Sequence, residues 1–403
     1  MVIGAGHAAG QLASSLRMQK FAGDITVFGD EPYAPYQRPP LSKKFLSGEL
    51  DREKLYFKPE AFYAEHDIKL ATKTRVMEID RKQQQITTEQ GVTAYDHLVI
   101  ATGTKVRRLQ TAGHHLGNIF YLRTIDDVEA IRTRLAADKK VLVCGGGYIG
   151  LEVAAIASQL NAQVTLLERE DRLLSRVVPD VVSDFFTQLH NDHGVNIKTG
   201  VTVDAFGGTS VVDHVVLSDG SKLDVDMVIV GIGVIPNTEL AIEAGLKVEN
   251  GIVVDAQCRT SDAVIYAIGD CASFYSPLYD RHIRLESVPN ALGQARVVAA
   301  QIMGQEKIYD DLPWFWSDQY DKKLQIAGLS QFYTDYVVRG EIAKGQFSVF
   351  YFDQDRLLAV DAINSPAEFM QSKKLIQKQC KLDKQQLADP DVDFKALALS
   401  ASA

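Results

Sequence analysis

Apolar and polar positions along the chain repeat one arrangement in two places. In each place a short apolar strand runs into a turn rich in glycine, a helical pattern follows, and a second apolar strand ends the unit. The segments are residues 1–3, 11–20 and 24–28 in the first copy and residues 141–144, 151–160 and 163–167 in the second. This order is the beginning of a Rossmann unit, so the pattern predicts an α/β protein with two dinucleotide-binding domains.

The pattern changes near residue 308. Apolar and polar residues alternate over 324–329, 336–339 and 347–352, and a helical pattern follows over 366–377. Alternation with a period of two is typical of strands that bury one face. The C-terminal part is therefore predicted to be a separate α+β domain with an antiparallel sheet.

Composition excludes several classes of protein. A length of 403 residues suits two or three domains, and a net charge of −9 argues against general nucleic-acid binding. The chain has no apolar run of 18 residues and no secretory pattern at its N-terminus, which predicts a cytoplasmic protein that does not enter a membrane. Its four cysteines have no C-x-x-C spacing, so we expect reduced thiols and no metal site.

The glycine turns indicate what the two domains bind. A helix N-terminus presents free N–H groups and a positive dipole end, and glycines let a pyrophosphate approach them. The first turn contains Gly4 and Gly6, with Ala9 where a third glycine often stands, and the second contains Gly145, Gly147 and Gly150. Two turns imply two dinucleotides, for which a flavin and a nicotinamide nucleotide are the natural pair. Only residues 1–3 precede the first turn, so either the natural chain starts earlier or the sheet tolerates a short strand.

Acidic residues follow the second strand of each unit. Glu168 stands where a carboxylate accepts hydrogen bonds from both hydroxyls of an adenosine ribose and repels a 2′-phosphate. This favours NADH over NADPH, although the adjacent Arg169 could tolerate the phosphate. In the first unit Asp30 is the predicted ribose ligand, with Glu31 as its solvent-exposed neighbour. His7 lies inside the first turn, and no role is assigned to it.

Further strings point to one family. They lie at residues 35–43, which include Arg-Pro-Pro-Leu-Ser-Lys, at 101–103 (Ala-Thr-Gly), at 266–270, at 285–291 and at 315–320, which include Trp-Ser-Asp. With both glycine turns, they resemble the FAD-dependent NADH:ferredoxin reductases of the putidaredoxin-reductase type. These include the reductase components of aromatic-ring dioxygenases and heme-thiolate monooxygenases. The turns and Ala-Thr-Gly occur in many flavoproteins, whereas the other two named strings are far more specific.

The resemblance implies a fold and an activity. The fold would have two Rossmann-like domains of the glutathione-reductase type and a C-terminal α+β domain. The FAD domain would be split in sequence, over 1–106 and 236–307, with the NADH domain inserted at 107–235 and the third domain at 308–403. The activity would be that of an oxidoreductase (EC 1.18.1.-) that passes electrons from NADH through FAD to a 2Fe-2S ferredoxin or a rubredoxin feeding an oxygenase.

The resemblance also implies roles for individual residues of the FAD site. Asp270 would bind the ribitol chain of FAD, Ala8 and Val76 would lie against its pyrophosphate and adenine, Arg123 would approach its phosphates, and the backbone of Val288 would meet the flavin pyrimidine. For Val76 and Val288, packing in a core is the alternative. The full predicted set of cofactor-binding residues is Gly4, Gly6, Ala8, Ala9, Asp30, Arg38, Lys43, Val76, Ala101, Thr102, Gly103, Arg123, Gly145, Gly147, Tyr148, Ile149, Gly150, Glu152, Glu168, Gly233, Gly269, Asp270, Val288 and Trp316.

Three residues are predicted to be catalytic. By the resemblance, Lys43 lies by the flavin and Glu152 approaches the nicotinamide amide, so we expect a buried ion pair between them beside the isoalloxazine. A buried pair costs desolvation, and its presence would indicate function more than stability. Trp316 would pack near the flavin edge where the partner docks, with ordinary core packing as the alternative.

Related flavoenzymes on this fold use thiols, so the positions of the cysteines matter. Residues 39–46 contain none, Cys144 is predicted to lie in a sheet, and Cys271 follows Asp270 on the ribitol side of the flavin. This argues against thiol-based catalysis. Two alternatives stay open: an NADH oxidase or disulfide reductase, and a redox-sensing interaction protein like apoptosis-inducing factor.

The partner of such a reductase is usually acidic, so an acidic reductase needs a local basic face. Arg296 matches a partner-facing arginine of the family, and each candidate could instead be a solvated charge. The candidates are Lys105, Arg107, Arg108, Arg281, Arg284, Arg296, Lys322 and Lys323. We expect a transient electrostatic complex and a reductase that is a monomer or a weak homodimer.

Overall fold

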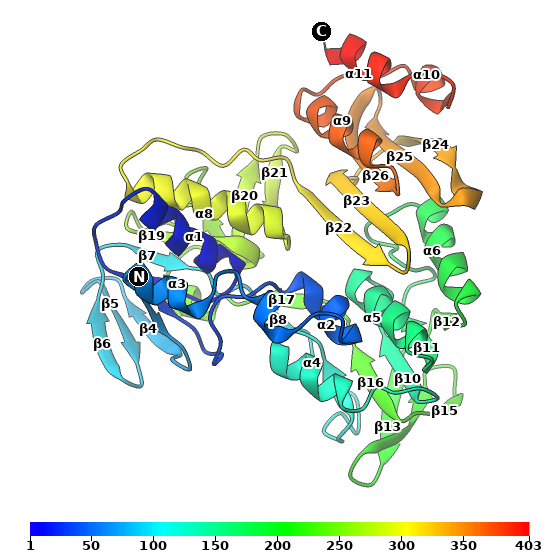
Figure 1. The fold of residues 1–403 in the computed structure, drawn as a ribbon, viewed down its shortest axis with the longest axis horizontal. Coiled ribbons are helices and arrows are strands. Elements are labelled where there is room, and N and C mark those ends of the chain that lie inside the picture. The colour runs from blue at the N-terminus through cyan, green and yellow to red at the C-terminus, as the bar shows by residue number, and fades with distance from the viewer. Residues whose placement is uncertain (403) are drawn as a thin grey trace. The chain divides into compact units, whose positions relative to one another are not determined.

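The computed structural model describes residues 1–402, and Figure 1 shows its helices and strands. The chain forms two compact units, each assembled from separate segments. Unit 1 contains Met1–Arg38, Asp51–Lys105 and Val234–Pro313, and unit 2 contains Pro39–Leu50, Val106–Gly233 and Trp314–Ala403. The C-terminal segment and the short segment 39–50 both group with the residues between 106 and 233. The finer division into an FAD, an NADH and a C-terminal domain stays a prediction.

The centre of unit 1 is a five-stranded parallel sheet with the order β19-β7-β1-β2-β3. Its strands are β1 (Val2–Ile3), β2 (Ile25–Phe28), β3 (Ile68–Ala71), β7 (Leu98–Ile100) and β19 (Ile265–Ala267). The two-residue strand β1 is central, because Val2 lies opposite Val27 on one side and Val99 on the other. Helices α1 (His7–Met18) and α8 (Val288–Ile302) pack together in this unit.

Smaller elements complete unit 1. One antiparallel sheet contains β4, β5 and β6, another sheet has the order β18-β20-β21, and β8 pairs with β17. Their bounds are β4 (Val76–Asp80), β5 (Gln85–Thr88), β6 (Gly91–Ala94), β8 (Thr104–Val106), β17 (Val234–Pro236), β18 (Ile252–Val254), β20 (Ala272–Ser276) and β21 (Arg281–Arg284). The helical segments are η2 (Arg52–Leu55), α3 (Glu60–Glu65), α7 (Glu239–Glu243) and η3 (Gly269–Cys271).

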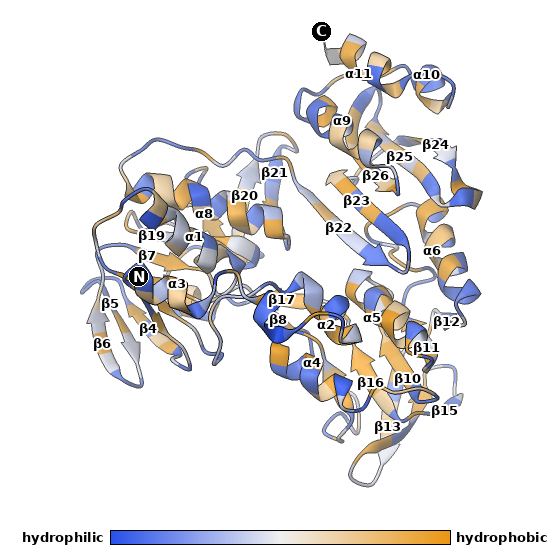
Figure 2. Ribbon diagram, in the orientation of Figure 1, coloured by the Kyte–Doolittle hydropathy of each residue, from blue (hydrophilic) through white to orange (hydrophobic). Residues whose placement is uncertain are grey.

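Unit 2 contains a second five-stranded parallel sheet, with the order β12-β11-β10-β16-β9. The strands are β9 (Ile119–Tyr121), β10 (Lys140–Cys144), β11 (Gln163–Glu168), β12 (Asn196–Thr199) and β16 (Met227–Val230). Figure 2 shows apolar residues concentrated on β10 and β16, as expected of parallel strands covered on both faces. Helices α4 (Ile125–Arg132), α5 (Tyr148–Gln159) and α6 (Asp180–Asp192) and an antiparallel sheet of β13 (Val203–Gly208), β14 (Val212–Leu217) and β15 (Lys222–Asp224) surround it.

The C-terminal segment forms an antiparallel sheet with the order β22-β23-β26-β25-β24. The strands are β22 (Trp314–Gln319), β23 (Lys322–Gly328), β24 (Asp335–Glu341), β25 (Gln346–Asp353) and β26 (Arg356–Ile363), joined by η4 (Ile342–Lys344). Helix α9 (Pro366–Gln377) packs on β23 and β26, and α10 (Lys384–Ala388) and α11 (Phe394–Ser402) follow. The predicted antiparallel sheet is confirmed, and the predicted helix 366–377 has the observed bounds of α9.

Two helices begin earlier in the chain than the sequence pattern predicted. Helix α1 begins at His7 rather than at residue 11, and α5 begins at Tyr148 rather than at residue 151. The reason is that Gly6 and Gly147 are the N-caps, so the later residues of each glycine motif already form the first helical turn. In residues 1–402, no helix has the length and hydropathy needed to cross a membrane.

Candidate dinucleotide sites

The first glycine turn of unit 1 fits a pyrophosphate. Gly4 has φ +106°, and a Cβ there would lie 2.2 Å from the carbonyl oxygen of Ala101, so a glycine is needed. Nothing lies within 4 Å of a Cβ built on Gly6, which is the N-cap of α1, and no side chain among the described residues caps this helix. The turn therefore presents helical N–H groups to open space, as a phosphate site requires.

Two further loops of unit 1 lie beside this turn. A Cβ on Gly269 would lie 3.3 Å from the Cβ of Ala8, so the predicted ribitol segment and the first turn are neighbours. Thr102 donates a hydrogen bond to the carbonyl oxygen of Asn237 at 2.8 Å, and the Asn237 amide donates back to the Thr102 carbonyl oxygen at 2.8 Å. Gly103, in the left-handed conformation (φ +62°), follows this pair of hydrogen bonds. These contacts hold the loop after β7 in one conformation.

Asp270 and Val288 lie in the first turns of helical segments. Asp270 lies in η3, and its carbonyl oxygen accepts a hydrogen bond from Arg284 at 3.0 Å. Val288 is the first residue of α8, after the N-cap Ser287. Val76 is buried at the start of β4, which is compatible both with core packing and with a place beside a cofactor.

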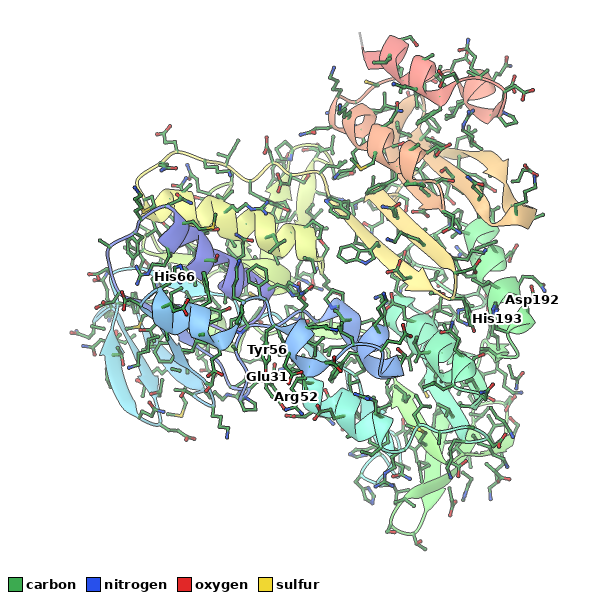
Figure 3. The ribbon with its side chains drawn as sticks, viewed as in Figure 1. Glu31, Arg52, Tyr56, His66, Asp192 and His193 are labelled. Atoms are coloured by element: carbon green, nitrogen blue, oxygen red, sulfur yellow. The ribbon has the colours of Figure 1, made fainter. Side chains whose placement is uncertain are left out.

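The acidic pair after β2 differs from the expectation. Asp30 is exposed, and Glu31, which we expected to be a solvated charge, is partly buried. The Glu31 carboxylate accepts from the Tyr36 hydroxyl and from Arg38, each at 2.6 Å (Glu31 is labelled in Figure 3). The expectation for Glu31 was wrong because its partners Tyr36 and Arg38 are brought to it by the folding of the following loop.

The second turn, in unit 2, has the same construction. Gly145 has φ +110°, and a Cβ on Gly150 would lie 1.9 Å from the Gly145 carbonyl oxygen. Nothing lies within 4 Å of a Cβ on Gly147, the N-cap of α5, and this helix also lacks a side-chain cap in the described chain. Tyr148 and Ile149 begin α5, with Ile149 exposed at 43%. The turn offers a second pyrophosphate site.

Glu168 is bound to this turn. One carboxylate oxygen accepts from the backbone N–H of Gly146 at 2.7 Å, and the other accepts from the N–H of Glu170 at 2.9 Å. A carboxylate has about four acceptor positions, so two remain for the hydroxyls of a ribose. Arg169 is 73% exposed and is paired with Glu170 at 2.6 Å. A 2′-phosphate at this place would meet the negative Glu168, which supports NADH.

Substituting Gly147 tests whether a dinucleotide occupies the space before α5. Because Gly147 has φ −83° and a Cβ there would contact nothing, Gly147→Ala is expected to leave the melting temperature unchanged. The added methyl group would intrude on a bound pyrophosphate, and we expect the Kd for NAD⁺ to rise about tenfold or more. Calorimetric titration with NAD⁺ checks this, with FAD content as the control. An unchanged Kd would show that the pyrophosphate lies elsewhere.

The carboxylate of Glu152, in unit 2, is buried and surrounded by hydrogen-bond donors. It is 3% exposed, lies one turn into α5, and accepts three side-chain hydrogen bonds. Lys43 and Ser42 donate to one carboxylate oxygen at 2.7 and 2.5 Å, and Ser317 donates to the other at 2.6 Å. The predicted ion pair between Lys43 and Glu152 is therefore formed. The roles of Ser42 and Ser317 were missed, although both stand in the strings that carry the family resemblance.

Three separate segments build this cluster. The helical segments η1 (Pro39–Ser42) and α2 (Lys44–Ser47) pack against α5 and position Lys43 and Ser42. Strand β22 also packs against α5 and brings Ser317 to Glu152. A carboxylate with one cation and two hydroxyl donors remains able to accept one more hydrogen bond.

Trp316 lies on the other face of β22. Successive residues of a strand point to opposite faces, and Phe315 and Ser317 contact Tyr148 and Glu152 of α5. Trp316 is partly exposed, and its ring centre is 5.7 Å from that of Trp314. It is therefore not a fully buried core residue.

The thiols are buried and poorly suited to catalysis. All four cysteines of the chain are free and buried. Burial raises the pKa of the Cys271 thiol, beside Asp270, and raises the pKa of Cys144 to about 12, at the end of β10. The prediction that Cys144 lies in a sheet is confirmed. Within residues 1–402, no group of three or more His, Cys, Asp and Glu side chains could hold a metal ion.

The candidates for a basic face differ in their surroundings. Arg296 is exposed on α8, between buried neighbours, and the Arg108 guanidinium lies 4.7 Å from the centre of the Tyr121 ring. Others pair with acidic side chains, namely Lys105 with Glu239, Arg284 with Glu286, Lys322 with Asp321 and Lys323 with Asp318. The candidates are divided between the two units, so the face remains a prediction.

Two Rossmann-type sheets, each with an open glycine turn at a helix N-terminus, define an oxidoreductase that binds two dinucleotides. Residues 1–295 match the pyridine nucleotide-disulphide oxidoreductase family, and residues 314–398 match the reductase C-terminal family. The chain is 45% identical to putidaredoxin reductase of Pseudomonas putida, over 100% of this chain and 97% of that protein. It is 43% identical to rhodocoxin reductase of Rhodococcus erythropolis, over 98% and 93%. The chain thus belongs to the ferredoxin reductases of the putidaredoxin-reductase type.

A solved structure shows the same fold. The covalent complex of putidaredoxin reductase with putidaredoxin contains a chain that is 45% identical, with a TM-score of 0.97 and coverage of 100% of this chain and 98% of that chain. The predicted family and fold class are confirmed by these likenesses.

Proposed function

We propose that this protein transfers electrons from NADH, through bound FAD, to a small iron–sulfur carrier, a 2Fe-2S ferredoxin or a rubredoxin, that feeds an oxygenase. The observation that carries the proposal is the combination of two open dinucleotide turns with four buried thiols. Relatives that reduce disulfides need a reactive cysteine beside the flavin. In this chain electrons have no accessible thiol to pass through, which favours an external carrier.

Separate sets of residues would bind FAD and NADH. Gly4, Gly6 and Ala8 would hold the FAD pyrophosphate at the start of α1, and Asp270 would accept hydrogen bonds from the ribitol hydroxyls. Gly145, Gly147 and Glu168 would hold the NADH pyrophosphate and ribose. The FAD domain would be 1–106 with 236–307, the NADH domain 107–235 and the C-terminal domain 308–403.

Lys43 and Glu152 would position the reacting ring of NADH. Bound FAD would supply the redox chemistry, accepting a hydride and releasing electrons singly. Glu152 would accept a hydrogen bond from the nicotinamide carboxamide, because one of its acceptor positions is left by Lys43, Ser42 and Ser317. Lys43 pairs with this carboxylate at 2.7 Å, and Glu152 is only 3% exposed. Trp316 would lie near the docked carrier. Reduced, buried thiols support a cytoplasmic location.

The test is reduction of cytochrome c by NADH with and without a panel of 2Fe-2S ferredoxins and rubredoxins. A rate that depends strongly on one carrier supports the proposal and identifies the carrier. Rapid oxygen uptake with no stimulation by any carrier would support an NADH oxidase instead. Slow turnover, with a change of oligomeric state on reduction, would support a redox-sensing interaction protein.

Charge reversal at Arg296 tests the docking of the carrier. Because Arg296 is exposed and the partner is expected to be acidic, Arg296→Glu should raise the KM for the carrier several-fold while reduction of ferricyanide by NADH stays unchanged. The matched control is Arg75→Glu, another exposed arginine of unit 1 that lies outside the candidate set. Added salt should also slow reduction of the carrier, because it screens the charges that attract the carrier to the reductase. Equal effects of the two substitutions would contradict a specific role for Arg296.

A further inference from the structure

A line of buried polar side chains extends from Glu152 away from Lys43. Ser317 and Gln319 on β22 and His190 on α6 are 1%, 1% and 0% exposed. Ser317 donates to Glu152 at 2.6 Å, Gln319 donates to Ser317 at 3.2 Å, and the His190 Nε2 lies 2.9 Å from the Gln319 side-chain oxygen. Buried polar groups are costly unless they are paired, so four of them in one connected line require an explanation.

The carboxylate determines the direction of every hydrogen bond in the line. An ionised Glu152 can only accept, so the single hydroxyl proton of Ser317 points to it. The Ser317 oxygen is then an acceptor for the Gln319 amide N–H. This turns the Gln319 oxygen toward His190, which must carry its proton on Nε2. Each donor in the line therefore points toward Glu152.

The far end of the line is neutral. Burial lowers the pKa of His190 to about 4, so its ring is uncharged near neutrality. Its Nδ1 faces the Tyr320 hydroxyl at 3.4 Å, and the Tyr320 ring stacks on His193 with ring centres 3.7 Å apart. Figure 3 shows His193 following the end of α6. The line thus supplies aligned dipoles to Glu152 without a second buried cation.

Aligned hydrogen bonds polarise one another and stabilise negative charge at the end where the donors point. In this cluster Lys43 and Ser42 hold one oxygen of Glu152, and the line holds the other. The plane of the carboxylate is thereby fixed by donors from η1, the adjoining loop and β22. A carboxylate held in this way is preorganised to accept from a substrate amide without reorienting.

We propose that Ser317, Gln319 and His190 are positioning residues that fix the orientation of Glu152 for the carboxamide of NADH. This rests on the proposed function, in which Glu152 contacts the nicotinamide. A purely structural role, joining β22 to α5 and α6, predicts a different outcome, because it would lower stability and leave the affinity for the nucleotide unchanged.

The experiment measures NAD⁺ affinity by calorimetry, KM and kcat for NADH with ferricyanide, and melting temperature. Ser317→Ala is expected to raise the Kd and the KM about tenfold, the effect of one charge-assisted hydrogen bond, and Ser317→Thr should restore most of the affinity. Gln319→Met, of similar volume, is expected to raise both about threefold. In the Ser317→Ala background Gln319→Met should have no further effect, because the line is already broken.

A matched control is Ser183→Ala. Ser183 is a fully buried serine of α6 whose hydroxyl donates to the Leu173 carbonyl oxygen at 2.7 Å, so its loss should lower the melting temperature without changing NADH kinetics. If Ser317→Ala and Gln319→Met behave like this control, the positioning proposal is overturned. If Glu152→Gln also leaves the Kd unchanged, the contact between Glu152 and nicotinamide fails as well. Neither outcome depends on the carrier, whose identity the cytochrome c assay tests separately.

Discussion

Replacing Glu152 by Ala is expected to raise the KM for NADH about tenfold, which corresponds to the loss of one charged hydrogen bond. The substitution also leaves the partly buried Lys43 without its carboxylate at 2.7 Å, so the melting temperature should fall. Steady-state kinetics with ferricyanide as acceptor separate this effect from docking of the carrier. A lower kcat with an equal fall in kcat/KM would indicate a contact made only in the transition state.

Two variants control for the loss of stability. The double variant Lys43→Met with Glu152→Gln removes both charges and should regain part of the stability but none of the affinity for NADH. Glu243→Ala removes an exposed carboxylate of α7 and should change neither quantity. A KM for Glu152→Ala equal to that of the unmodified protein would rule out its contact with NADH.

Replacing Asp361 by Asn is expected to stabilise the protein, and increasingly so as the pH rises. Asp361 lies on β26 and is 1% exposed, the hydroxyl of Tyr351 donates to it, and burial raises the pKa of its carboxyl to about 7 from an ordinary 3.8. Between these two values the native state keeps a proton that the unfolded chain has released. The free energy of unfolding of the unmodified protein therefore decreases as the pH rises through this window.

The size of this effect follows from the difference in pKa. About three pKa units correspond to a cost of about 4 kcal/mol at pH 8, and an Asn side chain keeps an oxygen for Tyr351 without any titration. We expect the Asn variant to melt at the same temperature as the parent at pH 4 and about 5 to 10 °C higher at pH 8. Melting curves over this range check the result, and a difference that does not change with pH would contradict it.

A second buried group titrates in the opposite sense. The pKa of His190, lowered to about 4 by burial, means that below pH 6.5 the unfolded chain binds a proton that the native state excludes. This contribution lowers stability as the pH falls. It is the same in the parent and in the Asp361→Asn variant, so the difference between the two proteins reports Asp361. The control Asp335→Asn, at an exposed position whose pKa is lowered by Lys384, should lose stability near neutrality.

Much of the fold could be predicted because its signals are local. A glycine at Gly150 is required by a carbonyl oxygen only five residues away in the same turn, and the apolar strands before and after each turn are continuous in sequence. Strand β26 was not predicted, because residues 357–363 are buried on both faces and so do not alternate. The Lys43–Glu152 pair could be expected only through the family resemblance, since more than one hundred residues separate the partners.

The sequence alone therefore determined the two dinucleotide turns and the strand, helix and strand that surround each of them, since these depend on neighbours within one turn or one strand pattern. Only the tertiary structure decided which side chains share a site. It brought the Ser317 hydroxyl to Glu152 across 165 positions of sequence, paired Glu31 with Tyr36 and Arg38, and buried Asp361 with the Tyr351 hydroxyl as a hydrogen-bond donor. Such contacts arise when distant segments pack together, and a hydroxyl or carboxyl carries no local pattern that distinguishes a buried partner from water.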